Sequence, residues 1–214
     1  MKKGAVLISL RPYNFMEKCL IISPHSDDGL LGMGGTIAKL IEEKAEIKYV
    51  ILSWAGQGFT KEEIKNALKE MGILENNIII LEHPVRDFSF CSSKIREDLI
   101  KIREDFKPDI VFAHNSHDLH QDHEVASRES FRVFRERTLF GYVLPWNLRE
   151  IKFDMFYTFQ EKHLQKKLDA LKLLNSQQDR FYYSPEKIRA WTISMGLFRR
   201  RDFAEAFEVL SQIK

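Results

Sequence analysis

The sequence predicts an α/β fold in which helices flank a mostly parallel sheet and form a layer in the C-terminal third. Short β-rich runs alternate with amphipathic segments through the first two thirds of the 214 residues, as in β–α units around a parallel sheet. The last third shows leucines at helical spacing instead. Because no Gly/Ser/Pro-rich linker, internal repeat or low-complexity tract separates these parts, we expect a single domain over residues 1–214.

The expected strands are short apolar runs rich in β-branched residues. They lie at residues 5–10, 19–23, 47–52, 77–81, 110–113 and 140–143. Every apolar run falls far short of the roughly 18 residues that a membrane span needs. The first residues also lack the full apolar core of a signal peptide. We therefore expect a cytoplasmic protein without a membrane span.

The helix with the clearest boundaries begins after Thr60. Thr60 and Glu63 have the spacing of a capping box, and Gly72 stands where a C-terminal cap belongs. Between them, Ile64 and Leu68 form part of one apolar face. Similar patterns predict helices at residues 34–43, 93–105 and 124–135.

Two helices are expected in the C-terminal third. The first carries a leucine stripe that we interpret as core, and the second begins at Ser184 and Pro185, an N-cap followed by a first-turn proline. The pattern at residues 202–210 fits either a helix or a strand, so we leave that segment undecided. The leucines of the stripe are Leu164, Leu168, Leu171 and Leu174.

Composition excludes several classes of protein. The 33 Lys and Arg residues against 31 Asp and Glu give a net charge of +2, which does not favour a nucleic acid or an anionic membrane as partner. A hydrophobic fraction of 44% excludes a disordered or fibrous chain. We interpret Cys19 and Cys91, the only cysteines, as free thiols in a reducing compartment.

The strongest chemical signal follows the strand expected at residues 19–23. It reads Ser-Pro-His-Ser-Asp-Asp and places His25, Asp27 and Asp28 at the carboxyl end of that strand, where ligands bind in open α/β sheets. Proline, serine and aspartate also suit an ordinary turn. A histidine beside two neighbouring carboxylates, however, favours a site for Zn²⁺ or a similar cation.

A second polar cluster follows the strand expected at residues 110–113. Four of the seven histidines fall within ten residues here, at His114, His117, His120 and His123. Because both clusters leave the carboxyl ends of strands, we expect them to converge above one edge of the sheet. Three protein ligands and an open position would make such a metal site catalytic, whereas four protein ligands would make it structural.

These residues resemble the PIG-L/LmbE-like zinc deacetylases, which remove N-acyl groups from N-acetylglucosamine-type compounds. The family's two hallmark motifs stand here as His25-Ser26-Asp27-Asp28-Gly29 and His120-Gln121-Asp122-His123. The resemblance extends over residues 18–145 and includes the glycine-rich helix start at residues 32–40 and the strand after Pro108. Ser26 replaces the usual proline and Gly29 the usual acid, a change that removes support behind the metal ligands.

The resemblance implies a Rossmann-like fold and a role for each motif residue. His25, Asp28 and His123 would bind the metal, Zn²⁺ or another divalent cation, and Asp27 would be the general base. His120 would stabilise the oxyanion as an imidazolium and protonate the leaving amine, with Asp122 orienting it. The resemblance further assigns Arg86 and Asp87 to substrate binding, and surface ion pairing is the alternative for both.

Several other residues have ordinary structural interpretations. We expect packing or loop roles for His114 and His117, and either loop capping or support of the site for Asp118. Ile37 stands where a dinucleotide loop needs its last glycine, so the glycines of residues 29–35 are interpreted as close-packing positions. Three aromatic residues are candidates for either core packing or sugar stacking, and three arginines form either a solvated turn or a phosphate contact. These are Trp54, Phe59 and Trp146, and Arg199, Arg200 and Arg201.

The resemblance implies a zinc-dependent hydrolase that removes an N-acetyl group from an amino sugar or glycoconjugate precursor. The expected partner is this small molecule, and a homo-oligomer is possible. The alternatives are a metal-dependent amidase for another N-acyl substrate, a nucleotide-binding module, and an inactive relative that acts as an interaction protein. A loop at residues 143–154 and the C-terminal helices are expected to set specificity.

Overall fold

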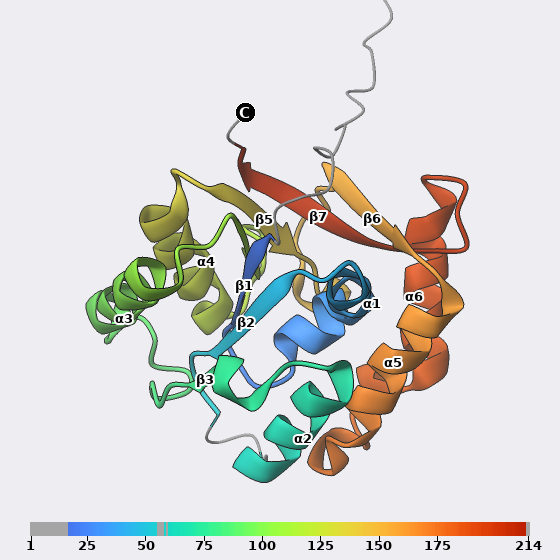
Figure 1. The fold of residues 1–214 in the computed structure, drawn as a ribbon, viewed down its shortest axis with the longest axis horizontal. Coiled ribbons are helices and arrows are strands. Elements are labelled where there is room, and N and C mark those ends of the chain that lie inside the picture. Colours follow the sequence, from blue (N-terminus) through green and yellow to red (C-terminus); the bar gives the residue numbers. More distant parts are fainter. Residues whose placement is uncertain (1–16, 55–57, 59, 213–214) are drawn as a thin grey trace, which may run out of the picture.

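The structure is a computed structural model that describes residues 17–54, 58 and 60–212. Seven strands form one sheet in the order β3-β2-β1-β4-β5-β7-β6 (Figure 1). The strands are β1 Lys18–Ser23, β2 Glu46–Ile51, β3 Ile78–Ile80, β4 Ile110–His114, β5 Thr138–Tyr142, β6 Met155–Phe159 and β7 Phe203–Ser211. The helices are α1 Asp28–Glu42, α2 Lys61–Met71, α3 Ser92–Phe106, α4 Gln121–Phe134, α5 Glu161–Lys172 and α6 Pro185–Leu197.

The expected mostly parallel sheet is confirmed. Strands β3, β2, β1, β4 and β5 run parallel to one another, and β7 is antiparallel to both β5 and β6. The strand expected at residues 5–10 lies outside the described residues. The undecided segment at residues 202–210 is β7, and β6 was not expected. The C-terminal third therefore completes the sheet as well as contributing helices.

Helices cover both faces of the sheet (Figure 1). Within β1, Cys19 and Ile21 belong to a core cluster shared with α1, α2 and α5, whereas Leu20 and Ile22 belong to a cluster shared with α3 and α4. This alternation is the two-residue period of a strand buried on both faces. The leucine stripe, which runs along α5 and ends at Leu174 just after it, is buried in the first cluster, as expected.

Helix α2 has the caps that its sequence predicts. The side chain of Thr60 accepts a hydrogen bond from the Glu63 amide, and the Glu63 carboxylate accepts one from the Thr60 amide at 2.8 Å. Gly72 ends the helix in the left-handed conformation at φ +97°. The capping box and the glycine cap are therefore confirmed.

Helix α1 begins earlier than the sequence predicts and is interrupted. It starts at Asp28, and Met33 departs from helical geometry at φ −145° and ψ 23°. The helix expected at residues 34–43 is its second half. Side chains from α5 and β7 contact the backbone of α1 at this interruption, a feature that the local sequence does not reveal.

The interruption, which we call the α1 break, is held by a buried ion pair. Lys167 donates to the Leu31 carbonyl oxygen at 2.6 Å and to Glu205 at 2.8 Å. Glu205 accepts from the amides of Gly35 at 3.0 Å and Thr36 at 2.7 Å. Both charged side chains are 1% exposed. A Cβ atom on Gly34 would lie 2.6 Å from Lys167 Cγ, so this glycine is required for close packing, as expected.

Helix α4 also begins earlier than expected, at Gln121 instead of residue 124. Its N-cap is His120, whose Nδ1 accepts from the Asp122 amide at 3.2 Å. Histidine is not among the residues that usually signal a helix start, which explains why the sequence placed this boundary one turn too late.

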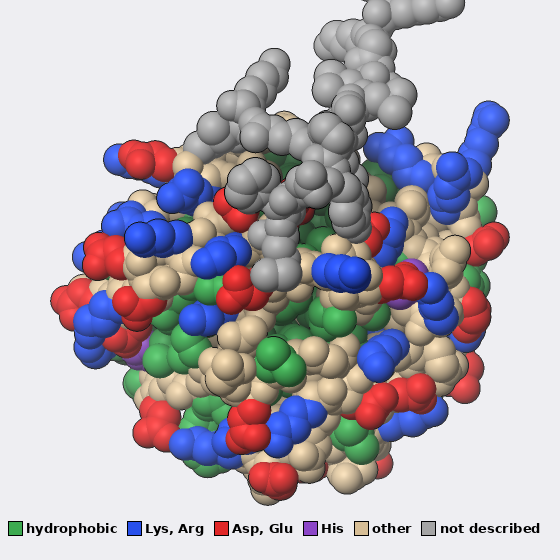
Figure 2. Space-filling view, in the orientation of Figure 1, with side chains coloured by type: hydrophobic (Ala, Val, Ile, Leu, Met, Phe, Trp, Pro, Cys, Tyr) green, Lys and Arg blue, Asp and Glu red, His purple; other side chains and the backbone are tan. Residues whose placement is uncertain are grey.

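The molecular surface agrees with the near-zero net charge. Acidic and basic side chains are interspersed on the face shown in Figure 2. Cys19 is buried and Cys91 partly exposed, and both are free, as expected. Across the part of the chain that the structure describes, every helix is too short or too polar to cross a bilayer.

Candidate active site

The two polar clusters meet at the carboxyl ends of β1 and β4. These strands are parallel neighbours, with Cys19, Leu20 and Ile21 opposite Ile110, Val111 and Phe112. The segment after β1 carries His25 and leads into α1, and the segment after β4 leads into α4, which carries His123. The expected convergence is present, because His25 Nδ1 lies 3.1 Å from His123 Nε2 although 98 positions separate these residues.

Three side chains form a tight triangle of potential metal ligands, which we call the metal triangle. Asp28 Oδ2 lies 3.1 Å from His25 Nδ1 and 3.2 Å from His123 Nε2, which completes the triangle with the 3.1 Å contact between the histidines. Tetrahedral zinc with bonds of about 2.0–2.1 Å would separate its ligand atoms by roughly 3.3 Å. All three residues are buried. The donor set and its spacing therefore fit Zn²⁺ or a similar divalent cation.

His120 lies at the edge of this triangle. One of its ring nitrogens is within 4.8 Å of ligand atoms of His25 and His123, and its ring stacks on His123 with centroids 4.4 Å apart. A second group of potential ligand atoms joins His114 and Asp118 to His123. His114 is fully buried and also stacks on His123, with ring centroids 4.1 Å apart, so it packs against a residue of the triangle.

Each histidine of the triangle has a carboxylate behind it. Asp122 Oδ2 lies 3.0 Å from His25 Nε2, and Asp118 Oδ1 lies 3.2 Å from His123 Nδ1. Such carboxylates fix the ring orientation and tautomer of a ligand histidine. Asp118 also accepts from the His120 amide at 2.8 Å, so it both caps the loop and supports the site.

The expected pairing of Asp122 with His120 is wrong. The carboxylate of Asp122 instead contacts His25 and accepts from the amides of Arg86 at 2.6 Å and Phe88 at 3.3 Å. The backbone amide of Asp122, and not its carboxylate, reaches His120. The reason is that Asp122 lies in the first turn of α4, where its side chain points toward His25 while the helix start engages the cap.

Asp27 makes a contact that the sequence did not indicate. Tyr183 Oη donates a hydrogen bond of 2.6 Å to Asp27 Oδ2, and both side chains are buried. Tyr183 belongs to a short 3₁₀ turn, Phe181–Tyr183, between α5 and α6. No spacing relates it to the two motifs, and its only sequence signal is an aromatic run just before a helix cap.

The charges of the site are strongly coupled. Burial would lower the pKa of His25, but Asp28 and Asp122 raise it to about 9. Burial would likewise lower the pKa of His123, but Asp28 and Asp118 raise it to about 10. Burial favours the neutral form of Asp28, yet both imidazoliums hold its pKa well below the usual range. A divalent cation that displaces the two imidazolium protons would leave the local charge unchanged.

The pKa values of Asp27 and His120 are shifted in the directions that suit proton transfer. Burial, followed by the neighbouring Asp28 charge, raises the pKa of Asp27 to about 6. Burial and the adjacent imidazoliums lower the pKa of His120. Because His120 Nδ1 accepts a hydrogen bond, the neutral ring carries its proton on Nε2. Nε2 is therefore the nitrogen of His120 that is left to donate a proton, and the role of His120 as an imidazolium stays a prediction.

The two residues expected to bind substrate follow β3. Arg86 has a positive φ of +69°, its amide donates to Asp122, and its side chain is exposed. Asp87 is also exposed. The backbone contact of Arg86 places this segment beside the site, but contact of either side chain with substrate stays a prediction.

The remaining candidates lie in different surroundings. His117 is partly exposed, and its Nε2 lies 3.5 Å from Glu208. Trp54 packs against the core with Lys61 over its ring, Trp146 stacks on Tyr182, and Phe59 lies outside the described residues. Among the arginines, Arg199 lies over the Phe156 ring in the connection from α6 to β7.

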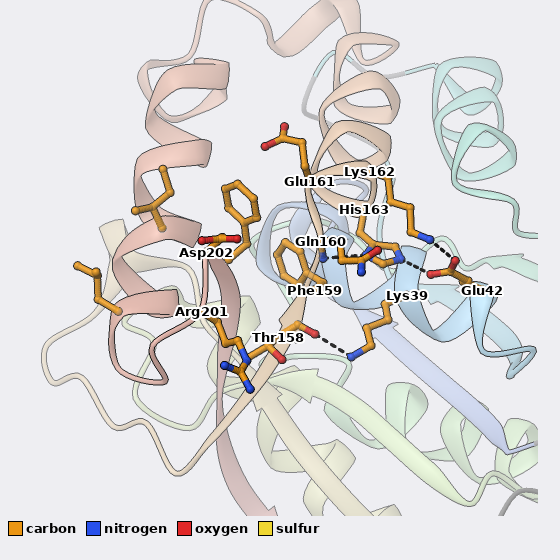
Figure 3. Close-up of a pocket in the computed structure, with 13 residues that line it drawn as sticks. Lys39, Glu42, Thr158, Phe159, Gln160, Glu161, Lys162, His163, Arg201 and Asp202 are labelled. Atoms are coloured by element: carbon orange, nitrogen blue, oxygen red, sulfur yellow. Dashed lines mark hydrogen bonds and ion pairs between the residues drawn. The ribbon is translucent and has the colours of Figure 1, made fainter.

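A pocket of about 940 Å³ lies elsewhere, between the end of α1, the start of α5 and α6 (Figure 3). Several of its charged groups pair with other residues of its lining. Lys39 donates to the Thr158 carbonyl oxygen at 2.8 Å, and Glu42 contacts both Lys162 and His163. None of the described residues that line this pocket belongs to the metal triangle, and we assign it no ligand.

Comparisons with known proteins find related sequences and the same fold. A diacetylchitobiose deacetylase from Thermococcus kodakarensis is 40% identical over 53 residues, which are 25% of this chain and only 20% of that protein. A conserved protein from Thermus thermophilus has the same fold, with a TM-score of 0.76 and 24% identity over 93% of this chain and 97% of its own.

An N,N'-diacetylchitobiose deacetylase from Pyrococcus horikoshii also shares the fold, with a TM-score of 0.76 and 22% identity over 90% of this chain and 83% of its own. The family model described as GlcNAc-PI de-N-acetylase matches residues 20–134, which include the metal triangle, Asp27 and His120. Since this match covers more than half of the sequence, the chain belongs to the PIG-L family of de-N-acetylases.

Proposed function

We propose that this protein is a zinc-dependent N-deacetylase that acts on an N-acetylated amino sugar or glycoconjugate precursor. The observation that carries the proposal is the triangle of His25, Asp28 and His123 with edges of 3.1–3.2 Å. Its position at the carboxyl ends of parallel strands is the usual ligand position of an open α/β sheet. Family membership supports the reaction class.

In this proposal the triangle holds the metal and Asp27 is the base. When bound, the cation would supply positive charge that polarises the amide carbonyl and acidifies a water molecule. Tyr183 engages Asp27 Oδ2, which leaves Oδ1 to accept a proton from the hydrolytic water. The pKa of about 6 keeps Asp27 deprotonated at neutral pH while making it a better base than an exposed aspartate.

His120 would act on the leaving group. The oxygen of water forms the new bond to the acetyl carbon as Asp27 takes one proton. The amide C–N bond then breaks as His120, in its protonated form, gives its Nε2 proton to the amine nitrogen, so that acetic acid, which ionises to acetate, and a free amine leave. Asp27 returns its proton through solvent and restores His120. Arg86 and Asp87, whose side chains are exposed, are proposed to bind substrate hydroxyls or a phosphate.

The test starts with metal content and acetate release. Protein purified without added metal should contain one zinc per chain and release acetate from N-acetylglucosamine derivatives, and a chelator should stop the release. Acetate itself must be measured, because a fold does not fix a reaction. Substrates with longer N-acyl groups distinguish a deacetylase from a general amidase.

Two variants separate the ligand from the base. His123→Ala should lose most of the bound metal, because it removes one of three protein ligands. Asp27→Asn should retain the metal and lose about 10²- to 10⁴-fold in kcat, the scale of a positioned proton-transfer group. Stoichiometric zinc in His123→Ala, or near-full kcat in Asp27→Asn, would refute these assignments.

A further inference from the structure

Two aromatic side chains stack on each other beside the site. Trp146, in the 3₁₀ turn Pro145–Asn147 after β5, and Tyr182, in the turn before α6, have ring centroids 4.1 Å apart and an interplanar angle of 11°. Trp146 remains 40% exposed, so its indole is accessible while one face rests on Tyr182. We call this pair the aromatic platform.

The aromatic platform is tied to both sides of the proposed reaction centre. Tyr182 directly precedes Tyr183, whose hydroxyl donates to Asp27. On the other side, the carbonyl oxygen of Asn147 accepts from the amide of Leu119, the residue before His120. Each ring of the platform is therefore one residue away from a group that contacts the site. Tyr182 adjoins Tyr183, and Trp146 adjoins Asn147.

The platform is fixed before any ligand arrives. Arg180 donates a 2.6 Å hydrogen bond to Tyr182 Oη, and its own side chain is exposed. The turn that carries Trp146 is also held by an isolated bridge between Asp118 and Leu148. A preorganised surface binds at a lower entropic cost than one that must form on contact.

We propose that the aromatic platform binds a saccharide ring adjoining the one that carries the N-acetyl group. The flat apolar face of a sugar ring suits an exposed indole, and a guanidinium beside it offers donors to hydroxyl groups. The acetamide must reach the triangle, Asp27 and His120, so the platform is left for the neighbouring ring. This inference rests on the proposed function and makes the preferred substrate an oligosaccharide or glycoconjugate.

The experiment compares N-acetylglucosamine with N,N'-diacetylchitobiose on the zinc-loaded full chain. Trp146→Ala should raise KM for the disaccharide about 3- to 10-fold, the scale of an aromatic contact, with kcat nearly unchanged. The monosaccharide kcat/KM should not change. Trp146→Phe should restore most of the disaccharide affinity. The control is Phe131→Ala, which removes an aromatic side chain of similar exposure, 44%, from α4. It should change neither KM nor kcat for either sugar.

Binding separates this inference from the proposed function. Calorimetry measures disaccharide affinity in the Asp27→Asn background, where turnover is slow. If the wild type releases no acetate but Trp146→Ala weakens disaccharide binding, the proposed function fails and the platform stands. If acetate is released and Trp146→Ala affects both sugars equally or neither, the platform is overturned. It is also overturned if the wild type neither binds nor hydrolyses either sugar.

Discussion

Replacing Glu205 by glutamine should strongly destabilise this protein. Glu205 accepts hydrogen bonds from Lys167, from two backbone amides of α1 and from the Thr36 hydroxyl, and it is 1% exposed. In Glu205→Gln the Lys167 ammonium stays buried without this counter-charge, although it still donates to the Leu31 carbonyl oxygen. The glutamine amide also places hydrogen-bond donors near other donors.

Removing one partner of a buried ion pair costs about 3–5 kcal/mol. For a chain of 214 residues, each kcal/mol lowers Tm by roughly 2–4 °C, so Tm should fall by roughly 6–20 °C. Lys167→Met combined with Glu205→Gln should be less destabilised than Glu205→Gln alone, because no unpaired charge is then buried. The exposed pair of Lys172 and Asp169 on α5 is the control, and Asp169→Asn should cost less than about 1 kcal/mol.

The free energy of unfolding is measured by urea denaturation of metal-free protein, since bound metal would add its own stabilisation. The slope of the free energy of unfolding against urea concentration should be the same in all variants, because they expose the same surface on unfolding. A loss of less than about 1 kcal/mol in Glu205→Gln, or a double variant that is the least stable of the set, would refute the reasoning that the α1 break depends on this pair.

Four further predictions concern the charges of the site. Metal binding at pH 7 should release about two protons, because the pKa values of His25 and His123 in the metal-free chain are about 9 and 10, and calorimetry in buffers of different ionisation enthalpy counts them. The same raised values stabilise the metal-free fold fully below about pH 6.5, and this stability should be lost as pH rises through 9 to 10 in denaturation curves; a flat profile would contradict it. Asp118→Asn should weaken zinc affinity about 10- to 100-fold in a competition titration, and unchanged affinity would remove Asp118 from the site. Tyr183→Phe should raise the pKa of Asp27 further above about 6, because the hydroxyl stabilises the carboxylate, and carbon NMR of metal-free protein detects an upward shift or refutes it.

The sequence predicts the parallel part of the sheet well, because β1, β2 and β4 are largely apolar runs bounded by turns. It does not identify β7, because two acids, Glu205 and Glu208, are buried within that strand. A buried acid is stable only with partners, and the partners of Glu205 lie on α1 and α5. Tertiary contacts therefore decide the conformation of this segment, and a local pattern cannot reveal them.

The candidate site likewise has a part that the sequence predicts and a part that only tertiary contacts decide. The strand ends predict that the two motifs converge, the family resemblance selects His25, Asp28 and His123 within them, and the structure brings these three side chains together. The carboxylate behind His25 depends on the orientation of α4 relative to β1, which local sequence does not reveal, so the predicted pairing of Asp122 with His120 is wrong. Tyr183 reaches Asp27 across 156 positions and from a different layer, a contact that no periodicity encodes.

The position of β7 imposes an order on folding. β7 lies between β5 and β6, although it follows both in the chain, so β6 has no place in the sheet until β7 arrives. On the ribosome, Glu205 is synthesised 82 positions after His123, which at about 5–20 residues per second is a delay of roughly 4–16 s. Throughout this interval His25, Asp28 and His123 have been synthesised, but the α1 break still lacks the acid that holds it in the folded protein. We therefore expect the α1 break to form only after β7 has paired with β5, and β6 to join the sheet with β7 or later.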